Sequence, residues 1–385
     1  MLFKNKNKYF YIIIICTIFL SVFGCIMVYS ASSYSALKNY NNKYFFLIKQ
    51  IIGVVLGFVS MTFFYNFNHY RLKKYHLLLV FISIVLLLLV FIPKIGISNY
   101  GANRWINLFG VSFQPSELAK FSLVLFASSY ASKNLDNMKT LKGILPIILV
   151  GGIFCVLVIL EPNMSITMCL GLIMIFMLFI SGMKFKHFLL ILIPALILVP
   201  ILIIIEPYRL KRLLAFLDPW ASPKGEGFQL IQSLYSLGSG GLFGVGLFNS
   251  RQKYLFLPFS ESDFIFSIIG EELGLIGGIF ILLVYFVLVY SCVKVGLQSK
   301  SRYSCYLACG IGAVIIIQVI LNIAVVTGSI PPTGLPLPLI SAGSTSIVMF
   351  LSAIGIVLNI SKKQEENEID YKKTRYYLLI KDKKI

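Results

Sequence analysis

The sequence predicts an all-α polytopic membrane protein of about ten transmembrane helices, with one long extracellular loop that carries amphipathic half-helices. Three observations lead to this fold class. Hydrophobic residues make up 58% of the 385 positions and charged residues only 13%, whereas soluble domains are about half apolar and a quarter charged. Apolar runs of about 20 residues, long enough for a helix to cross a bilayer, recur along the chain. Lys and Arg gather in the segments between alternate pairs of runs.

The apolar runs predict one membrane domain over residues 1–361 and a cytoplasmic tail over 362–385. The candidate spans lie near 9–30, 45–65, 76–93, 115–132, 143–160, 164–182, 187–205, 264–293, 303–327 and 341–360. The first run is longer than the apolar core of a signal peptide, so we expect an uncleaved signal-anchor. The run 264–293 exceeds one crossing, so we expect it to tilt or to begin at the membrane surface.

The formal net charge of +19 would suggest nucleic-acid binding in a soluble protein. Here the basic residues flank membrane spans, so topology and anionic lipid headgroups explain them better, and we expect no nucleic acid as a partner. With the N-terminus inside, the inner segments are basic: 4–8, 71–74, 133–142, 184–186 and 294–302. The positive-inside rule therefore places both termini in the cytoplasm.

Cysteine and histidine usage gives no metal motif. The seven cysteines all lie in or at the ends of apolar runs, without a CxxC pair, and are typical of small buried hydrophobic residues. The three histidines lie on the inner side and form no cluster. We therefore predict no metal site and no established cofactor, and leave open whether a divalent cation is required.

The loop 206–263 is the one outer segment rich in cations, which include Arg209, Arg212 and Lys253. Loops near this length largely escape the positive-inside rule. Its apolar residues are spaced as in half-helices that lie on a membrane surface. The cations could bind phosphate or pyrophosphate, or could contact lipid phosphates, and the sequence favours neither.

Asp263 stands where this loop meets the next span. Spacing alone favours a helix N-cap, since carboxylates accept hydrogen bonds from the first turn of a helix. A general base is the other interpretation, because apolar neighbours can raise the pKa of a carboxyl group at a membrane interface.

Charged residues at membrane depth cost about 2.5–3.5 kcal/mol on insertion scales. Glu117 and Lys120 lie three residues apart on one helix, either as a mutual ion pair or as the polar wall of an outward-opening cavity. The turn Glu161-Pro162-Asn163 favours a capping or structural role over catalysis. Glu271 and Glu272 are adjacent, so we expect only one to point into the bundle.

Ordered motifs cover nearly every span, and through them the chain strongly resembles the SEDS family (shape, elongation, division and sporulation), the membrane glycosyltransferases of the FtsW, RodA and SpoVE types. The matching stretches are 28–32, 101–106, 113–120, 212–213 with 216–220, 232–234, 238–241, 263–266 with 270–272, and 333–338. They resemble the FtsW/SpoVE division and sporulation branch more than the elongation branch. One departure is 341–346, Ser-Ala-Gly-Ser-Thr-Ser, where the family usually has Ser-Tyr-Gly-Gly-Ser/Thr-Ser.

The resemblance implies a peptidoglycan glycosyltransferase in the bacterial cytoplasmic membrane, with its active face outside, that polymerises lipid II during division or sporulation. The implied reaction is an inverting transfer from an undecaprenyl-pyrophosphate-linked donor, with Asp263 as catalytic base. Glu117 and Lys120 match the family's cavity-lining pair, and Arg104, Arg209, Arg212 and Lys253 become candidates for substrate binding. The implied partners are a class B penicillin-binding transpeptidase and other division or sporulation proteins.

Two other functions stay open at this point. Intramembrane charges would suit a flippase or transporter for a lipid-linked precursor, although no clear internal repeat appears. A non-catalytic division scaffold would leave Asp263 and the loop cations unexplained.

Overall fold

The computed structural model describes the backbone of residues 8–93, 95–99, 102–108, 111–205, 207–332 and 334–381. Thr333, the first residue of the predicted motif 333–338, lies outside this part of the chain. The side chains of 195–199, 201–209 and 363–381 are also outside it, and they include the candidate residue Arg209.

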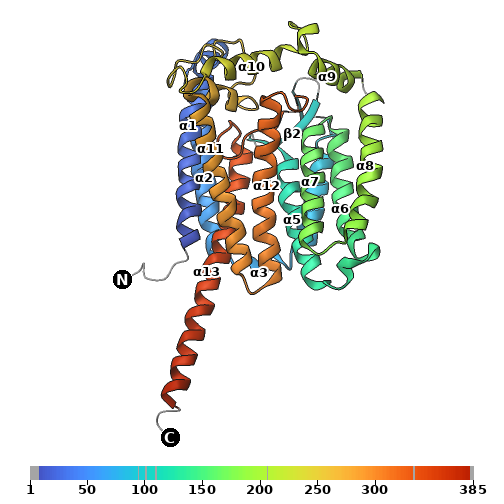
Figure 1. Cartoon of the computed structure of the whole chain (residues 1–385), viewed down its shortest axis with the longest axis vertical. Coiled ribbons are helices and arrows are strands. Elements are labelled where there is room, and N and C mark those ends of the chain that lie inside the picture. Colours follow the sequence, from blue (N-terminus) through green and yellow to red (C-terminus); the bar gives the residue numbers. More distant parts are fainter. Residues whose placement is uncertain are drawn as a thin grey trace.

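Long helices occupy the predicted spans and stand side by side (Figure 1). They are α1 (Lys8–Tyr40), α2 (Phe45–Asn66), α4 (His76–Leu89), α5 (Pro115–Lys133), α6 (Leu141–Leu160), α7 (Met164–Ile180), α8 (Phe185–Ile205), α11 (Ile265–Gln298), α12 (Arg302–Val326) and α13 (Ser344–Lys381). The short α3 (His69–Leu72) and a 3-10 turn, η1 (Asn137–Lys139), connect helices at one end of the bundle. The polytopic membrane fold predicted from the apolar runs is confirmed.

Six helices of the described chain are long and apolar enough to cross a membrane by length and composition: α1, α2, α6, α11, α12 and the first part of α13. Helices α4, α7 and α8 are shorter apolar helices. Helix α5 is different, since its polar residues are buried inside the bundle rather than exposed on its surface.

Residues 207–263 of the predicted loop fold across one end of the bundle, which we call the loop end (Figure 1). It contains the predicted half-helices, α9 (Pro207–Leu217) and α10 (Phe228–Gly240), with a 3-10 turn, η2 (Pro219–Ala221), between them. The N-terminal end of α1 and the C-terminal part of α13 lie at the opposite end, as expected for an even number of crossings (Figure 1).

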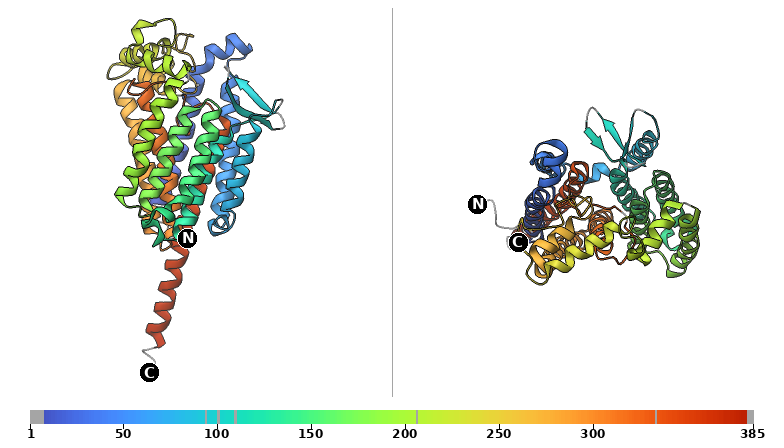
Figure 2. Two further views of the ribbon diagram at one scale, coloured as in Figure 1. Left: turned by 90° about the vertical axis from the view of Figure 1, so that its right-hand side faces the viewer. Right: turned by 90° about the horizontal axis from the view of Figure 1, so that it is seen from above.

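A small antiparallel sheet at the loop end was not predicted (Figure 2). Its strands are β1 (Gly96–Asn99), β2 (Ala102–Leu108) and β3 (Val111–Phe113), in the order β1-β2-β3. Ile106 on the central strand pairs with Gly96 on one side and Phe113 on the other, and is fully buried. The sheet holds residues 102–106 of the predicted motif beside the start of α5, while Gly101 lies outside the described residues.

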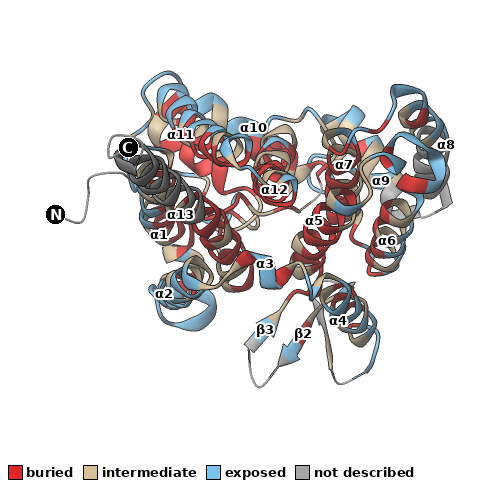
Figure 3. Ribbon diagram, turned by 90° about the horizontal axis from the view of Figure 1, so that it is seen from below, coloured by how far each residue is buried: buried red, intermediate tan, exposed pale blue. Residues whose placement is uncertain are grey.

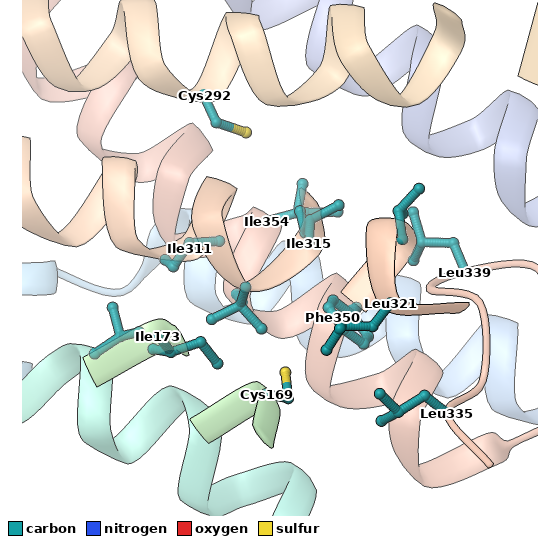
Figure 4. Close-up of a cluster of buried hydrophobic side chains, with 14 of the residues drawn as sticks. Cys169, Ile173, Cys292, Ile311, Ile315, Leu321, Leu335, Leu339, Phe350 and Ile354 are labelled. Carbon is teal, nitrogen blue, oxygen red and sulfur yellow. The ribbon is translucent and has the colours of Figure 1, made fainter. Parts of the chain in front are cut away.

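The core is formed where α12 packs against α5, α7, α11 and α13 (Figure 3). Residues that meet there come from distant parts of the chain, such as Cys169, Ile315 and Phe350 (Figure 4). All three are fully buried, whereas apolar side chains on the outer faces of α2, α4 and α11 are exposed. This distribution fits a bundle whose outer surface faces lipid.

The overlong run 264–293 becomes one helix with a break. Helix α11 departs from helical geometry at Gly274, whose φ of 70° is open to glycine at little cost. The segment after α10 fills the break, since Leu275 and Ile276 donate backbone hydrogen bonds to Gly241 and Leu242 at 2.9 and 3.2 Å. Two helix ends are also later than predicted: α1 continues to Tyr40, and α13 runs on as a helix to Lys381.

Candidate active site

A cavity of about 660 Å³ opens at the loop end. Its walls come from six separate parts of the chain: α2, the stretch from β2 through β3 to Gln114, Asn163, the segment from α9 to α10, residues 259–264, and residues 332 and 334–346. Its charged lining residues are Lys49, Arg104, Arg212, Glu226, Glu261 and Asp263. Three of the predicted site residues, Asp263, Arg104 and Arg212, are therefore brought together here.

Asp263 does not cap the helix it precedes. Helix α11 begins at Ile265, and Phe264 takes the N-cap position without a side-chain cap hydrogen bond. The capping interpretation is wrong because the chain makes one further residue of turn before the helix starts. The carboxylate lines the cavity instead, and it accepts no hydrogen bond from the residues that the structure describes.

The backbone around Asp263 is held tightly although its carboxylate is not. Asn322 on α12 donates its side-chain amide to the Asp263 carbonyl at 2.8 Å. The two preceding carbonyls are also bound, Ser262 by the Ser341 hydroxyl at 2.6 Å and Glu261 by the backbone N–H of Ala342 at 2.9 Å. The segment between α12 and α13 thus fixes where the carboxylate can lie.

Gly334 makes room for the carboxylate. Its φ is +69°, and a Cβ added there would lie 3.1 Å from Asp263 Oδ2. A side chain at this position would be strained and would also crowd the carboxylate.

Burial raises the pKa of Asp263 to about 6. The charges of Arg104 and Arg212 oppose this rise, while the Glu261 carboxylate adds to it. Burial also raises the pKa of Glu261. Near neutral pH, Asp263 is therefore ionised but is a stronger base than an ordinary aspartate, which suits proton abstraction.

Two guanidinium groups line the cavity from different elements. Arg104 on β2 donates to the carbonyls of Glu161 and Pro162, with a distance of 3.5 Å to the first. Arg212 on α9 donates to the Pro332 carbonyl at 3.1 Å and lies 4.0 Å from the Glu226 carboxylate. Both guanidinium groups line the cavity, and guanidinium groups are well suited to binding phosphate or carboxylate oxygens.

Glu117 and Lys120 lie beneath the cavity and do not line it. They form an ion pair of 2.8 Å with both side chains fully buried, which fits the first of the two sequence interpretations. Lys120 also donates to Gln318 Oε1, and Ser346, which does line the cavity, donates to Glu117 at 3.1 Å. These bonds compensate the cost of burying two charges.

Lys253 belongs to a different cluster. Its side chain is 5% exposed, its ammonium group lies 3.3 Å from the Glu272 carboxylate, and it does not line the cavity. The neighbouring Glu271 accepts from the Arg251 N–H at 2.8 Å and from the Ser250 hydroxyl. Both adjacent glutamates are buried, but in different surroundings: Glu272 accepts from the Ser30 hydroxyl on α1 at 2.6 Å, whereas Glu271 is covered by α10 and the folded-back loop.

Sequence reasoning missed several lining residues. Lys49 and Gln50 lie within the apolar span of α2, and their place in the wall depends on packing that local sequence does not reveal. Glu261 could have been noticed, since it is a second acid two residues before Asp263. Among the described residues, no group of three or more His, Cys, Asp or Glu side chains gathers as for a metal ion.

The turn after α6 contains a buried acid that does not cap. Asn163 caps α7 by accepting from the Ile166 N–H at 3.3 Å. Glu161 is fully buried, and neither of its carboxylate oxygens has a hydrogen-bond partner among the described residues. Burial raises the pKa of Glu161 to about 8, against the opposing charge of Arg104. The capping role expected for this turn is confirmed for Asn163 only.

The chain matches the family described as "Cell cycle protein", FtsW/RodA/SpoVE, over residues 10–366. It is 38% identical to stage V sporulation protein E of Bacillus subtilis over 354 residues, which cover 91% of this chain and 96% of that protein. It is 37% identical over 361 residues to a Geobacter protein named "Probable peptidoglycan glycosyltransferase FtsW", covering 94% of this chain and 98% of the relative.

Two solved structures share the fold. A chain of a peptidoglycan synthase complex, described as coordinating polymerisation and crosslinking, superposes with a TM-score of 0.77 at 25% identity, covering 91% of this chain and 97% of that chain. The rod shape determining protein RodA of Thermus thermophilus gives a TM-score of 0.66 at 22% identity, covering 91% and 96%. The chain belongs to the FtsW/RodA/SpoVE family of cell cycle proteins.

Proposed function

We propose that this chain is a peptidoglycan glycosyltransferase that polymerises lipid II, with Asp263 as its general base. The observation that carries the proposal is the Asp263 carboxylate, which lines the cavity at the loop end with a raised pKa of about 6. Relatives in the same family bear the name of this activity.

The residues of the cavity suit an inverting transfer. The 4-hydroxyl of the acceptor sugar attacks the anomeric carbon of the donor, and Asp263 takes the hydroxyl proton as the new C–O bond forms. The bond from the anomeric carbon to the pyrophosphate oxygen breaks, and its electron pair leaves with undecaprenyl pyrophosphate. Arg104 and Arg212 are placed to stabilise the charge that develops on this leaving group.

The other candidates take different roles in this proposal. Glu117 and Lys120 support the cavity from beneath, and Lys253 holds the loop. Arg209 stays a candidate because it lies on α9, one turn before Arg212.

We also propose that the loop end faces the outside of the cytoplasmic membrane. The basic segments 71–74, 133–142 and 294–302 lie at the opposite end, where the positive-inside rule places the cytoplasm. A transpeptidase is the expected partner, since a structural relative belongs to a complex described by polymerisation and crosslinking.

The test is polymerisation of lipid II by the purified chain, alone and with a class B penicillin-binding transpeptidase, in the presence of Mg²⁺, Mn²⁺ or EDTA. Glycan polymer should form with wild type and disappear with Asp263→Asn. The matched control is Asp136→Asn, an exposed acid at the opposite end of the bundle, which should keep full activity.

Three outcomes would contradict the proposal. Full polymerisation by Asp263→Asn would show that Asp263 is not the general base. Translocation of lipid II in proteoliposomes without polymer would indicate a flippase. Neither activity in any arm, with normal binding of division proteins, would indicate a scaffold.

A further inference from the structure

Two buried amides on α12 face the segment that closes the cavity. Gln318 and Asn322 lie one helical turn apart, and each is at most 1% exposed. Gln318 Nε2 donates to the Pro336 carbonyl at 2.7 Å, and Asn322 Nδ2 donates to the Leu335 carbonyl at 2.6 Å. Asn322 Nδ2 also donates to the Asp263 carbonyl at 2.8 Å, so one side chain binds both sides of the cavity.

The segment 334–338 needs these donors. It has no regular secondary structure, and two of its residues are prolines, which have no N–H with which to join a strand ladder. Its buried carbonyls must still be hydrogen-bonded, because an unpaired buried carbonyl costs about 1–3 kcal/mol. The α12 amides satisfy the carbonyls of Leu335 and Pro336 and thereby fix this part of the segment against Asp263.

The segment touches the carboxylate directly. Gly334 lies so close to Asp263 Oδ2 that an added Cβ would be 3.1 Å away. Any movement of 334–336 relative to Asp263 therefore changes the space around the carboxylate. Asn322 holds the segment in place relative to Asp263 because its amide nitrogen donates to the carbonyls of both Asp263 and Leu335.

The buried ion pair orients the first of the two amides. Lys120 donates to Gln318 Oε1, so the amide nitrogen of Gln318 must point the other way, toward Pro336. Lys120 is held in turn by Glu117 at 2.8 Å. The Glu117–Lys120 pair is thus linked to the cavity wall by hydrogen bonds through Gln318 on α12 as well as through Ser346.

We infer that Gln318 and Asn322 are positioning residues, which hold the segment 334–336 and the Asp263 backbone in register, and that Glu117 and Lys120 act on Asp263 through Gln318. The inference rests on the proposed function of Asp263. In this inference the intramembrane ion pair of Glu117 and Lys120 helps to position Asp263 without contacting the substrate.

The first test is Asn322→Leu, which keeps the approximate size and removes both hydrogen bonds. We expect kcat for lipid II polymerisation to fall about 10- to 100-fold, as for a small misplacement of a catalytic group, while KM stays within about threefold. The acidic limb of the pH–rate profile should also move, because the surroundings of the carboxylate change. Gln318→Met should give the same pattern, and Asn322→His, which keeps one donor, should recover part of kcat.

The matched control is Asn359→Leu on α13. Asn359 is a buried amide at the opposite end of the bundle, which donates to the Tyr65 carbonyl at 2.7 Å and lies 2.7 Å from His69 Nδ1. Its loss should lower thermal stability to a similar degree, yet leave kcat and the pH profile of the folded protein unchanged.

Hydrogen–deuterium exchange separates this inference from the proposed function. Exchange at 334–343 should rise in Asn322→Leu and not in Asn359→Leu, whether or not the chain is a transferase. Unchanged exchange, or unchanged kcat and pH profile in Asn322→Leu, would overturn the positioning role. Wild type that exchanges as expected but forms no polymer would overturn the proposed function alone.

Discussion

Two groups of acids at the loop end differ in what they bind. Glu271 and Glu272 are sealed between α10, α11 and the folded-back loop, where hydroxyls, backbone N–H groups and Lys253 donate to them. Asp263 lines a cavity and accepts no hydrogen bond from the described residues. Both oxygens of Glu271 are thus bound by the protein itself, whereas the Asp263 carboxylate remains available for a proton or a ligand.

The largest expected effect is a loss of activity, which should distinguish Asp263 from the buried pair Glu271 and Glu272. Asp263→Asn removes the proposed base, and general-base catalysis contributes about 10²- to 10⁴-fold, so kcat should fall by that order. Thermal unfolding should stay close to wild type, because no hydrogen bond to the carboxylate is lost. A large loss of stability in this variant would show that Asp263 is structural after all.

The second largest expected effect is a loss of stability, which should distinguish the buried pair Glu271 and Glu272 from Asp263. Lys253→Met leaves Glu272 as a buried carboxylate without its cation, which costs about 3–5 kcal/mol of unfolding free energy. The measurement is thermal or denaturant unfolding in detergent, with Lys224→Met, an exposed loop cation, as control. If folded Lys253→Met protein binds lipid II more weakly at unchanged stability, the residue belongs with the substrate-binding cations.

Glu161 is an intermediate case, since it is buried like Glu271 but lacks hydrogen-bond partners. Its pKa of about 8 in the folded protein lies above the ordinary value of 4.5. Between these values, the unfolded chain releases the proton and the folded chain retains it, so the free energy of unfolding falls as pH rises.

Glu161→Gln should remove that dependence. We expect the variant to gain stability over wild type, on the order of 2 kcal/mol, as pH rises from about 5 to 8. Unfolding curves at both pH values measure it, with Glu226→Gln as an exposed control. A stability difference that does not change with pH would mean that Glu161 is ionised in the folded protein.

Gly334→Ala should reduce the space around the Asp263 carboxylate. The positive φ and the contact with Asp263 Oδ2 predict a loss of about 1–2 kcal/mol of stability together with reduced kcat. Gly152→Ala, which meets open space on α6, is the control and should retain both. Normal activity in Gly334→Ala would show that the carboxylate does not need this room.

The smallest effect is a shift in pH dependence. Polymerisation should decline as pH falls below about 6, because Asp263 must be ionised to accept a proton. Glu261→Gln removes a negative charge that raises the pKa of Asp263, so the acidic limb should move to lower pH. A limb that stays in place would show that Glu261 exerts no effect on the base.

The sequence was sufficient for those features that depend on local composition. The spans follow from apolar length, and the half-helices α9 and α10 follow from amphipathic spacing. The small sheet was missed because its strands are short, with β3 only Val111–Phe113. Strands of that length have too little alternation to stand out beside apolar helices.

The site was predicted in part for a similar reason. Asp263 and Arg212 lie in the polar loop, where charged residues can be recognised as site candidates from the sequence. Lys49 and Gln50 come from a membrane helix, and the roles of Gln318 and Asn322 depend on which loop α12 meets. Such pairings of distant segments cannot be read from spacing along one helix.

The break in α11 at Gly274 has a consequence for how the molecule assembles. Residues 241–246 bind the backbone of 271–276, so the loop that carries Asp263 is closed at its base by contacts between neighbouring parts of the chain. Closing a loop of this length costs little conformational entropy, and local contacts form early in folding. The loop and the start of α11 can therefore fold as one unit, before the distant segment 334–338 arrives to complete the cavity.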